Sequence, residues 1–412
     1  MPEAVIVSTA RSPIGRAFKG SLKDERPDDL AAAMVSAALA RIPSFDAADS
    51  AGRGLDDLYL GCAEPSGEAG SNMARVVTIL AGLDNVPGAT INRFCASSLQ
   101  TLRMAFHAIK AGEGHAFVSA GVEAVSRYRD WAGAGETDAS THNPLFDAAR
   151  QRTAARAASN TPWTDPRLGG RMPDIYIAMG QTAENVATSF GIRRAEQDAW
   201  AVLSQNRAEA AIASGFYARE ITPYTRRDGT VVDRDDSPRA GVTLESVSAL
   251  QPVFRAEGTV TAGNACPLND GAAAVVVMSD TRARELGLEP LARIVSTGVS
   301  ALSPELMGMG PVEASQRALA FAGLGMEDID LVELNEAFAV QVVASARELG
   351  IDHNKLNIHG GAIALGHPFG MTGARMTTTL LNGLRERDAT LGLATLCVGG
   401  GQGMAVVLER LS

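Results

Sequence analysis

Short apolar runs alternate with stretches of helical periodicity along most of this 412-residue chain, and this alternation limits the folds open to it. It predicts sheets of parallel strands with helices packed on their faces. One hydrophobic core does not need so long a chain, so two or three packed units are expected. The predicted strands are Ala4–Thr9, Asp57–Leu60, His115–Ala120, Ala272–Met278, Arg293–Thr297, Leu331–Leu334 and Leu391–Cys397, and the predicted helices are Ala31–Arg41, Ser97–Lys110, Arg194–Ser214, Ser315–Ala322 and Phe338–Leu349.

A four-residue sequence occurs twice. Ile6-Val7-Ser8-Thr9 returns as Ile294-Val295-Ser296-Thr297, and each copy is followed by a helix, a glycine-flanked reactive residue and a strand that ends in glycine. The repetition predicts a duplicated α/β unit. Between residues 126 and 250 the chain is rich in Ala, Gly, Thr, Pro, Asp and Arg and poor in long apolar strands, which is typical of a functional or mobile insertion.

The charge balance excludes one class of partner. The 37 Lys and Arg residues and 47 Asp and Glu residues give a net charge of −10, so no basic stripe is available for nucleic-acid phosphates. A small anionic ligand is not excluded, because local arginines can line a pocket. Arg226, Arg227 and Arg234 are candidates, although exposed arginines commonly only face solvent. No apolar segment reaches membrane-spanning length.

Four cysteines lie far apart in the chain: Cys62, Cys95, Cys266 and Cys397. Their spacing matches neither a zinc site nor a disulfide framework, so we expect no bound metal. Reduced thiols in the cytoplasm are the natural interpretation.

Cys95 lies where an apolar segment meets a predicted helix. Unpaired N–H groups and the positive end of the helix dipole favour a thiolate there, and the thiolate is the reactive form. The alternative is a buried structural cysteine.

Three C-terminal segments carry further reactive groups. Asn335 follows the apolar run from Asp330, His367 lies in a glycine-rich loop, and Cys397 precedes a glycine cluster. With Cys95 they make a nucleophile, an activator and a separate acid/base. Taken singly, Asn335 is also a suitable helix N-cap, His367 a turn histidine and Cys397 a core residue.

The chain resembles the thiolase family over nearly its whole length. Four motifs carry the resemblance in the family's order: the Cys95 box, Asn335-Glu336-Ala337-Phe338, Gly366-His367-Pro368 and Cys397-Val398-Gly399-Gly400-Gly401. The resemblance implies an α/β fold in which a βαβαβαββ unit occurs twice, packed as five layers, α-β-α-β-α, with an inserted loop domain. We expect residues 1–125 and 251–289 to form the N-terminal half, 126–250 the loop domain over the CoA site, and 290–412 the C-terminal half.

The resemblance also implies a role for each reactive group. Cys95 would be the nucleophile that carries the acyl group, and His367 would activate it. His367 and a water held by Asn335 would donate hydrogen bonds to the leaving thioester oxygen. Cys397 would act as acid and then as base. The N–H groups of Cys95 and Gly399 would form a second oxyanion hole.

Other positions are expected to contact CoA: Met179, Cys266, Ala337 and Phe338. Short-chain biosynthetic thiolases commonly carry histidine where Ala178 stands, and Cys266 replaces a common serine. These departures favour a degradative 3-ketoacyl-CoA thiolase of fatty acid β-oxidation over an acetoacetyl-CoA-forming enzyme. CoA would be a substrate and no cofactor is implied. The resemblance suggests a homodimer or homotetramer.

Two further interpretations stay open. A decarboxylating ketoacyl synthase has related architecture but typically pairs its cysteine with two histidines, or with a histidine and an asparagine, whereas here Cys397 takes the second acid/base position. A catalytically silent CoA- or lipid-binding scaffold would not need Cys95, His367 and Cys397 together.

Overall fold

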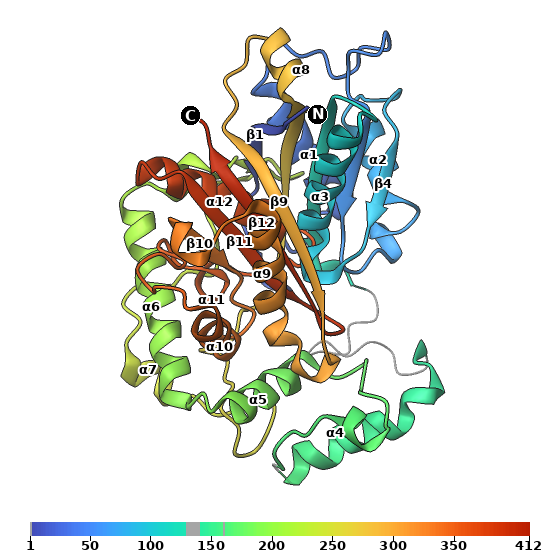
Figure 1. Ribbon diagram of the computed structural model, residues 1–412. Helices are drawn as coiled ribbons and strands as arrows, with labels where there is room; N and C mark the ends of the chain where they lie inside the picture. The colour runs from blue at the N-terminus through green and yellow to red at the C-terminus, as the bar shows by residue number, and fades with distance from the viewer. Residues whose placement is uncertain (1, 129–140, 160) are drawn as a thin grey trace.

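The computed structural model describes residues 2–128, 141–159 and 161–412, and its N-terminal and C-terminal halves lie side by side (Figure 1). The strands and helices of the first half are β1 (Ala4–Arg11), β2 (Gly15–Arg16), β3 (Asp57–Gly61), β4 (Gly88–Ile91), β5 (Ala116–Ala124), β8 (Asn269–Ser279), α1 (Pro27–Ala40), α2 (Met73–Leu80), α3 (Ser97–Ala111) and α8 (Asp280–Glu285). Those of the second half are β9 (Ala292–Ala301), β10 (Leu331–Leu334), β11 (Leu391–Val398), β12 (Gln402–Arg410), α9 (Gly310–Ala322), α10 (Ala339–Leu349), α11 (Ala362–Leu365) and α12 (Thr372–Glu386).

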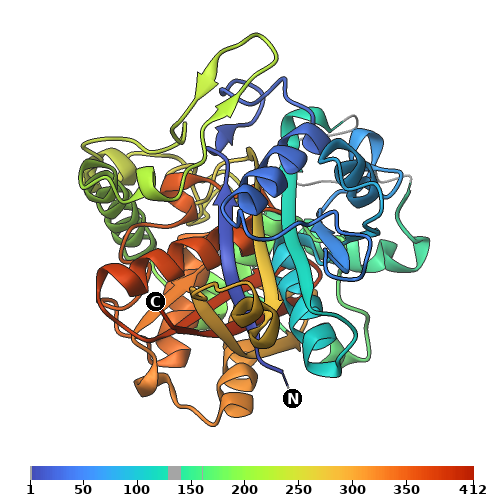
Figure 2. The same cartoon turned by 90° about the horizontal axis from the view of Figure 1, so that it is seen from above.

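The chain between β5 and β8 carries mostly helices. They are α4 (Asp147–Ser159), α5 (Met179–Phe190), α6 (Arg194–Ala213) and α7 (Leu244–Ser248), with a small hairpin of β6 (Tyr224–Thr225) and β7 (Val231–Val232). The hairpin lies beside the first half (Figure 2), where the Tyr224 hydroxyl donates to Glu25 and Arg227 pairs with Asp29.

The two halves repeat one strand order. The sheet runs β10-β11-β12-β9-β1-β8-β5-β3-β4, so both halves follow the same order outward from the central β1–β9 pair. The repeated Ile-Val-Ser-Thr sequences lie in β1 and β9. Ser8 donates to the carbonyl of Ala38 in α1, and Ser296 makes the same bond to Ala318 in α9. The predicted duplication is confirmed.

Three buried apolar clusters separate five layers. One lies between α1 and α2 and the strands of the first half. The second surrounds α3 and α12, which are sandwiched between the two sets of strands. The third lies between the strands of the second half and helices α9 and α10. This is the predicted α-β-α-β-α order, with the added finding that β1 and β9 join the two halves into one sheet.

The expectation of parallel sheets is correct only in part. The pairs β3–β4, β3–β5 and β10–β11 are parallel. The central pairs, β5–β8, β8–β1, β1–β9, β9–β12 and β12–β11, are antiparallel. A physical reason is visible at β11 and β12, which are joined by the short turn 399–401, too short for the helical crossover that a parallel pair requires.

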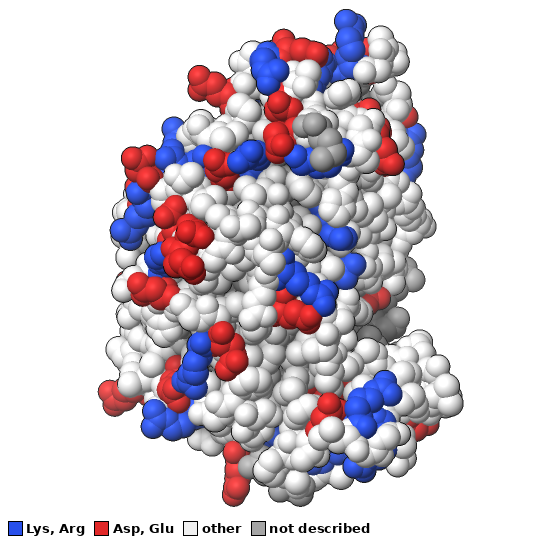
Figure 3. Space-filling view, in the orientation of Figure 1, with Lys and Arg blue, Asp and Glu red and all other residues white. Residues whose placement is uncertain are grey.

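On the face drawn in Figure 3, acidic and basic side chains are interspersed, so this face carries no continuous basic surface for nucleic-acid phosphates. None of the described helices combines the length and the apolar composition that a membrane crossing requires.

A buried ion cluster fastens the insertion to the core. Arg11 on β1 is fully buried and pairs with Glu220 at 2.8 Å and with Asp235 at 2.7 Å. Glu220 also accepts from Thr379 and Asn382 of α12. One guanidinium therefore neutralises two carboxylates that burial would otherwise penalise.

We expect Arg11→Met to lower the free energy of unfolding by about 3–5 kcal/mol, because it leaves those carboxylates buried without a counter-charge. Urea denaturation followed by circular dichroism measures the change. The matched control is Arg284→Met, which removes an exposed pair with Asp280 and should change stability by less than about 0.5 kcal/mol. Equal effects of the two substitutions would contradict the account.

Candidate active site

Cys95 lies in a single 3₁₀ turn, Phe94–Ala96, directly before α3. The Ser97 hydroxyl fixes this turn, because it accepts from the N–H of Arg93 at 2.9 Å and donates to the carbonyl of Phe94 at 2.6 Å. The turn packs against β11 and α12 of the second half. The backbone N–H groups of Gly399 and of Cys95 itself both lower the pKa of the Cys95 thiol. The two N–H groups that the sequence predicts as oxyanion-hole donors therefore lie beside this thiol.

The protonation state of Cys95 differs from the sequence expectation. Burial raises the pKa of its thiol to about 12, which outweighs the lowering effect of the Gly399 N–H; the charge of Glu123 raises it further. The expectation of a thiolate is wrong for the unliganded site, because loss of solvation exceeds the gain from the helix terminus. At neutral pH Cys95 is a thiol.

Two further thiols converge on Cys95. Cys397 is fully buried in β11, and Cys266 precedes β8. Burial raises the pKa of each thiol, and the proximity of Cys95 raises both further. Three neutral thiols, contributed by both halves of the chain, therefore share one site.

His367 is held in one orientation and one tautomer. Its backbone N–H donates to Oδ1 of Asn269 at 3.0 Å, and its Nδ1 lies 2.6 Å from the hydroxyl of Thr372. That hydroxyl donates to the carbonyl of Pro368, so it accepts the proton of Nδ1. The lone pair of Nε2 then faces the amide of Asn335 at 3.2 Å. Burial lowers the pKa of His367 to about 3, which leaves a neutral imidazole with Nε2 able to accept a proton.

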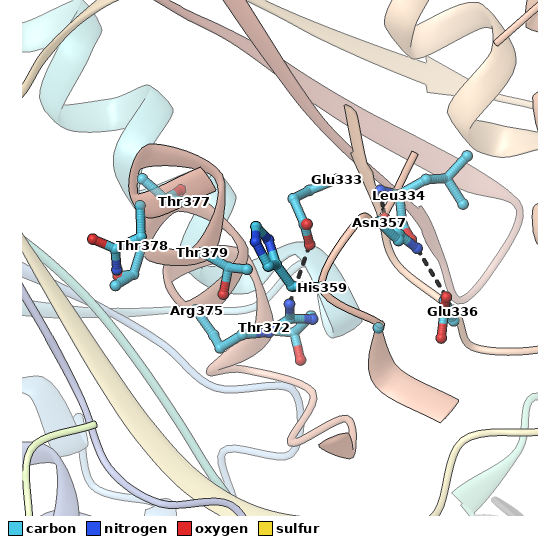
Figure 4. Close-up of polar contacts among 12 residues, drawn as sticks. Glu333, Leu334, Glu336, Asn357, His359, Thr372, Arg375, Thr377, Thr378 and Thr379 are labelled. Atoms are coloured by element: carbon cyan, nitrogen blue, oxygen red, sulfur yellow. Dashed lines mark hydrogen bonds and ion pairs between the residues drawn. The ribbon is translucent and has the colours of Figure 1, made fainter. Parts of the chain in front are cut away.

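Glu336 fixes the position of Asn335 at the end of β10. Its buried carboxylate accepts from Trp200, Ser204 and Asn357, at 3.0, 2.6 and 3.0 Å, and from the backbone of Ile363. Figure 4 shows Asn357 between the β10 backbone and Glu336. Oδ1 of Asn335 is buried and has no partner among the described residues. The sequence motif pointed to Asn335; the supporting role of Glu336 was missed, although it is the next residue.

A second buried carboxylate joins the loop of His367 to the first half. Glu123 in β5 accepts from the N–H of Gly370 at 2.7 Å, from the N–H of Ala63 at 2.9 Å and from the hydroxyl of Tyr128 at 2.6 Å. The approach is so close that a Cβ on Gly121 would lie 2.0 Å from the carbonyl oxygen of Gly370. Sequence reasoning missed Glu123, whose only signal was a carboxylate in an otherwise apolar strand.

Arg375 supplies a buried positive charge near His367. It pairs with Glu333 at 3.4 Å inside the second half (Figure 4). Burial raises the pKa of Glu333 to about 8, and the charge of Arg375 opposes that rise. The same charge helps to keep the pKa of His367 low, so the imidazole stays neutral.

The residues expected to contact CoA lie close to one another. Ala265 pairs with Phe338 in an isolated bridge, and the N–H of Cys266 donates to Ala337 at 3.1 Å. The Phe254 ring packs edge-on against Phe338 at 6.2 Å. Met179 begins α5 and packs against the apolar cluster that contains Phe338.

The arginine candidates lie elsewhere. Arg226 pairs with Glu25 and Asp228, and Arg227 pairs with Asp29 beside α1. Because carboxylates already neutralise both, the structure gives no support to their predicted role in binding an anion.

Alkylation of Cys95 by iodoacetamide should accelerate by about tenfold per pH unit from roughly pH 6 to 10, because the thiolate fraction rises tenfold per unit below a pKa near 12. Stopped-time mass spectrometry measures the rate, with Cys95→Ser as background. A small thiol such as N-acetylcysteine serves as the reference and levels off above about pH 8.5. A plateau for Cys95 near neutral pH would show a thiolate and contradict the account.

The chain matches known proteins over nearly its full length. Residues 4–281 match the family model "Thiolase, N-terminal domain", and residues 288–410 match "Thiolase, C-terminal domain". The chain is 41% identical to the 3-ketoacyl-CoA thiolase of Bacillus subtilis (strain 168), over 99% of this chain and 100% of that protein. It is 41% identical to a beta-ketoadipyl-CoA thiolase of Acinetobacter baylyi, over the full length of both. The crystal structure of the Bacillus anthracis acetyl-CoA acetyltransferase superposes with a TM-score of 0.84 at 37% identity, covering 100% of this chain and 99% of that one.

Proposed function

The chain belongs to the thiolase family and is an acyltransferase, and we propose that it cleaves 3-ketoacyl-CoA with free CoA through an acyl thioester on Cys95. The observation that carries this proposal is the position of Cys95, whose turn packs against β11 of the second half and whose thiol lies beside the N–H of Gly399. Donors at that position stabilise the oxyanion that forms when the sulfur attacks a carbonyl.

In the first half-reaction, the sulfur of Cys95 attacks the 3-keto carbon while its proton passes to Nε2 of His367. The bond between the second and third carbons then breaks, and acetyl-CoA leaves as an enolate. Cys397 gives its proton to the enolate carbon. The neutral state of all three groups suits this sequence, because Cys95 and Cys397 begin as proton donors and His367 begins as an acceptor.

In the second half-reaction, the Cys397 thiolate takes the proton of the incoming CoA thiol. The CoA sulfur attacks the acyl thioester, and Cys95 leaves and recovers its proton from His367.

The enolate of the first half-reaction also needs stabilisation. The unpartnered Oδ1 of Asn335 supports a bound water at the site, which with the imidazolium Nε2–H would stabilise the enolate oxygen of acetyl-CoA.

CoA is a substrate in this scheme, and no cofactor takes part. Met179, Cys266, Ala337 and Phe338 would contact its pantetheine arm, and the residues inserted between β5 and β8 would cover it; the proximity of these four residues to one another supports this role. The residue types at positions 178 and 266 favour degradative cleavage in β-oxidation, and the Bacillus subtilis relative is named 3-ketoacyl-CoA thiolase. The free state of the four cysteines is consistent with a reducing cytoplasm.

The direct test is thiolysis of acetoacetyl-CoA by CoA, with acetyl-CoA quantified by chromatography. The purified protein should form acetyl-CoA, and Cys95→Ala should not. If the protein instead consumes malonyl thioesters with release of carbon dioxide, it is a decarboxylating synthase; if it turns over neither, it is a silent scaffold.

Cys397→Ala should separate the two proton roles. Transfer of an acyl group from an activated thioester to Cys95 needs no carbanion, so it should continue within about threefold of the parent rate. Thiolysis should fall by at least about a hundredfold, since the enolate loses its acid and CoA its base. Rapid-quench measurement gives both rates, and Ser44→Ala, which removes an exposed hydroxyl outside the site, is the control. Equal loss of the two activities would contradict the assigned role.

A homo-oligomer is the further part of the proposal. β4 ends the sheet, so its outer edge is unpaired among the described strands. Beside it, α2 exposes Val76, Ile79 and Leu80 by 36, 45 and 51%. An open edge next to an apolar helix face is suited to a second copy related by a two-fold axis.

Ile79→Glu should convert the oligomer into smaller species, because it places charge in this apolar face. Light scattering after size exclusion measures the mass. Leu411→Glu, at 49% exposure and away from β4, is the control that should leave the mass unchanged. An unchanged mass for both variants would exclude this interface.

A further inference from the structure

A chain of side-chain hydrogen bonds joins the turn that carries Cys95 to the glycine turn that begins at Gly399. Arg93, two residues before Cys95, donates from Nη1 to Oε1 of Gln402 at 2.9 Å. Nε2 of Gln402 donates in turn to the carbonyl of Gly399 at 3.4 Å, a longer bond. On its other side the guanidinium donates from Nε to Oε1 of Gln100 in α3 at 2.9 Å. Arg93 is therefore fixed within the first half and bonded to the second.

Neither turn is stiff enough to set this geometry alone. Phe94 has a φ of +44°, a conformation that bulky side chains rarely adopt and that persists only where the surroundings fix it. Gly400 and Gly401 have φ values of +76° and +75°, which glycine adopts freely, so the glycine turn resists little distortion by itself. The position of the Gly399 N–H relative to Cys95 therefore depends on contacts between the two turns.

The surroundings of Arg93 are unusual for a charged side chain. The guanidinium is half-buried, and its side chain bonds two glutamine amides but no carboxylate of the described residues. Burial lowers the pKa of Arg93, and the charge of Arg103 lowers it further. A cation that leaves water without a counter-charge costs free energy, so stability does not explain an arginine here. Its planar fork does, because it holds two acceptors in fixed directions at once.

We propose that Arg93 and Gln402 are positioning residues of the reaction, which hold Gly399 against the Cys95 turn so that both N–H donors meet one carbonyl oxygen. Neither side chain needs to touch the reacting atoms. This inference rests on the proposed function, because the two donors have a task only if an oxyanion forms beside Cys95.

Two reactions of the same sulfur separate positioning from packing. Acetylation of Cys95 by acetyl-CoA passes through an oxyanion, whereas alkylation by iodoacetamide displaces iodide from a saturated carbon and forms none. In Arg93→Met, acetylation should slow by about tenfold or more, which is less than the hundred- to thousandfold cost of removing a donor outright. Alkylation at the same pH should stay within about twofold. Peptide-level mass spectrometry after timed quenching measures both rates.

A double-mutant cycle tests whether the two residues act through one bond. Arg93→Met combined with Gln402→Met should slow acetylation no more than about twofold beyond the more impaired single variant. The control is Arg317→Met, which removes a bond from an exposed arginine to the carbonyl of Val299 and should alter neither reaction.

Gln402→Glu separates the bond to Arg93 from its transmission to Gly399. The carboxylate keeps Arg93 as a charged partner, but it places an acceptor oxygen against the carbonyl of Gly399. Acetylation should fall by about tenfold or more, while the midpoint of urea unfolding does not fall. A merely structural contact would not give that split. This variant also decides the matter if Arg93→Met does not fold.

Three results would overturn the inference. Equal slowing of acetylation and alkylation would mean that Arg93 only packs the Cys95 turn, and undiminished acetylation in Arg93→Met or Gln402→Glu would mean that Gly399 needs no such hold. Losses that multiply in the double variant would mean that the two residues act separately. A failure of the proposed function is distinguishable, because the unmodified protein would then form no acetyl-CoA from acetoacetyl-CoA and CoA.

Discussion

The contact between Glu123 and Gly370 is the constraint on which the site depends. Cys95 belongs to the first half of the chain, whereas Asn335, His367 and Cys397 belong to the second, so no local structure brings them together. The Glu123 carboxylate binds the loop that carries His367 to the end of β5, and the missing side chain of Gly121 permits the approach. Five hydrogen-bonding groups of the first half and of the loop converge on this one buried carboxylate, so separating the loop from the first half would leave several buried polar groups without partners.

Burial at the contact between the two halves also sets the protonation states of Cys95, Cys397 and His367. The same desolvation that raises the pKa values of Cys95 and Cys397 lowers that of His367, so all three are neutral before substrate arrives. Three neutral reacting groups do not have to be solvated as an ion pair in the absence of substrate. In the proposed reaction, negative charge appears only as the sulfur attacks, beside the N–H groups of Gly399 and Cys95.

Much of this arrangement was predictable from the sequence, and the exceptions have physical causes. Strand β10 was predicted at its true bounds, Leu331–Leu334, whereas β1, β3, β5, β8, β9 and β11 extend beyond their predicted ends. Helix α12 was missed because its threonines and glycines have low helix propensity; it forms because both sets of strands bury it, and Thr377 and Thr378 bond back to their own helix. The motifs pointed to the candidate reactive residues. They gave neither the partner of His367, which is Thr372, nor the protonation of Cys95, since both follow from packing.

The central claim is that Cys95 alone carries the acyl group. Peptide-level mass spectrometry after brief exposure to acetoacetyl-CoA, without free CoA, measures this most directly. The account predicts one acetyl group on the peptide that contains Cys95, and its loss when CoA is added. An acetyl group found instead on Cys266 or Cys397, or on no cysteine, would contradict it.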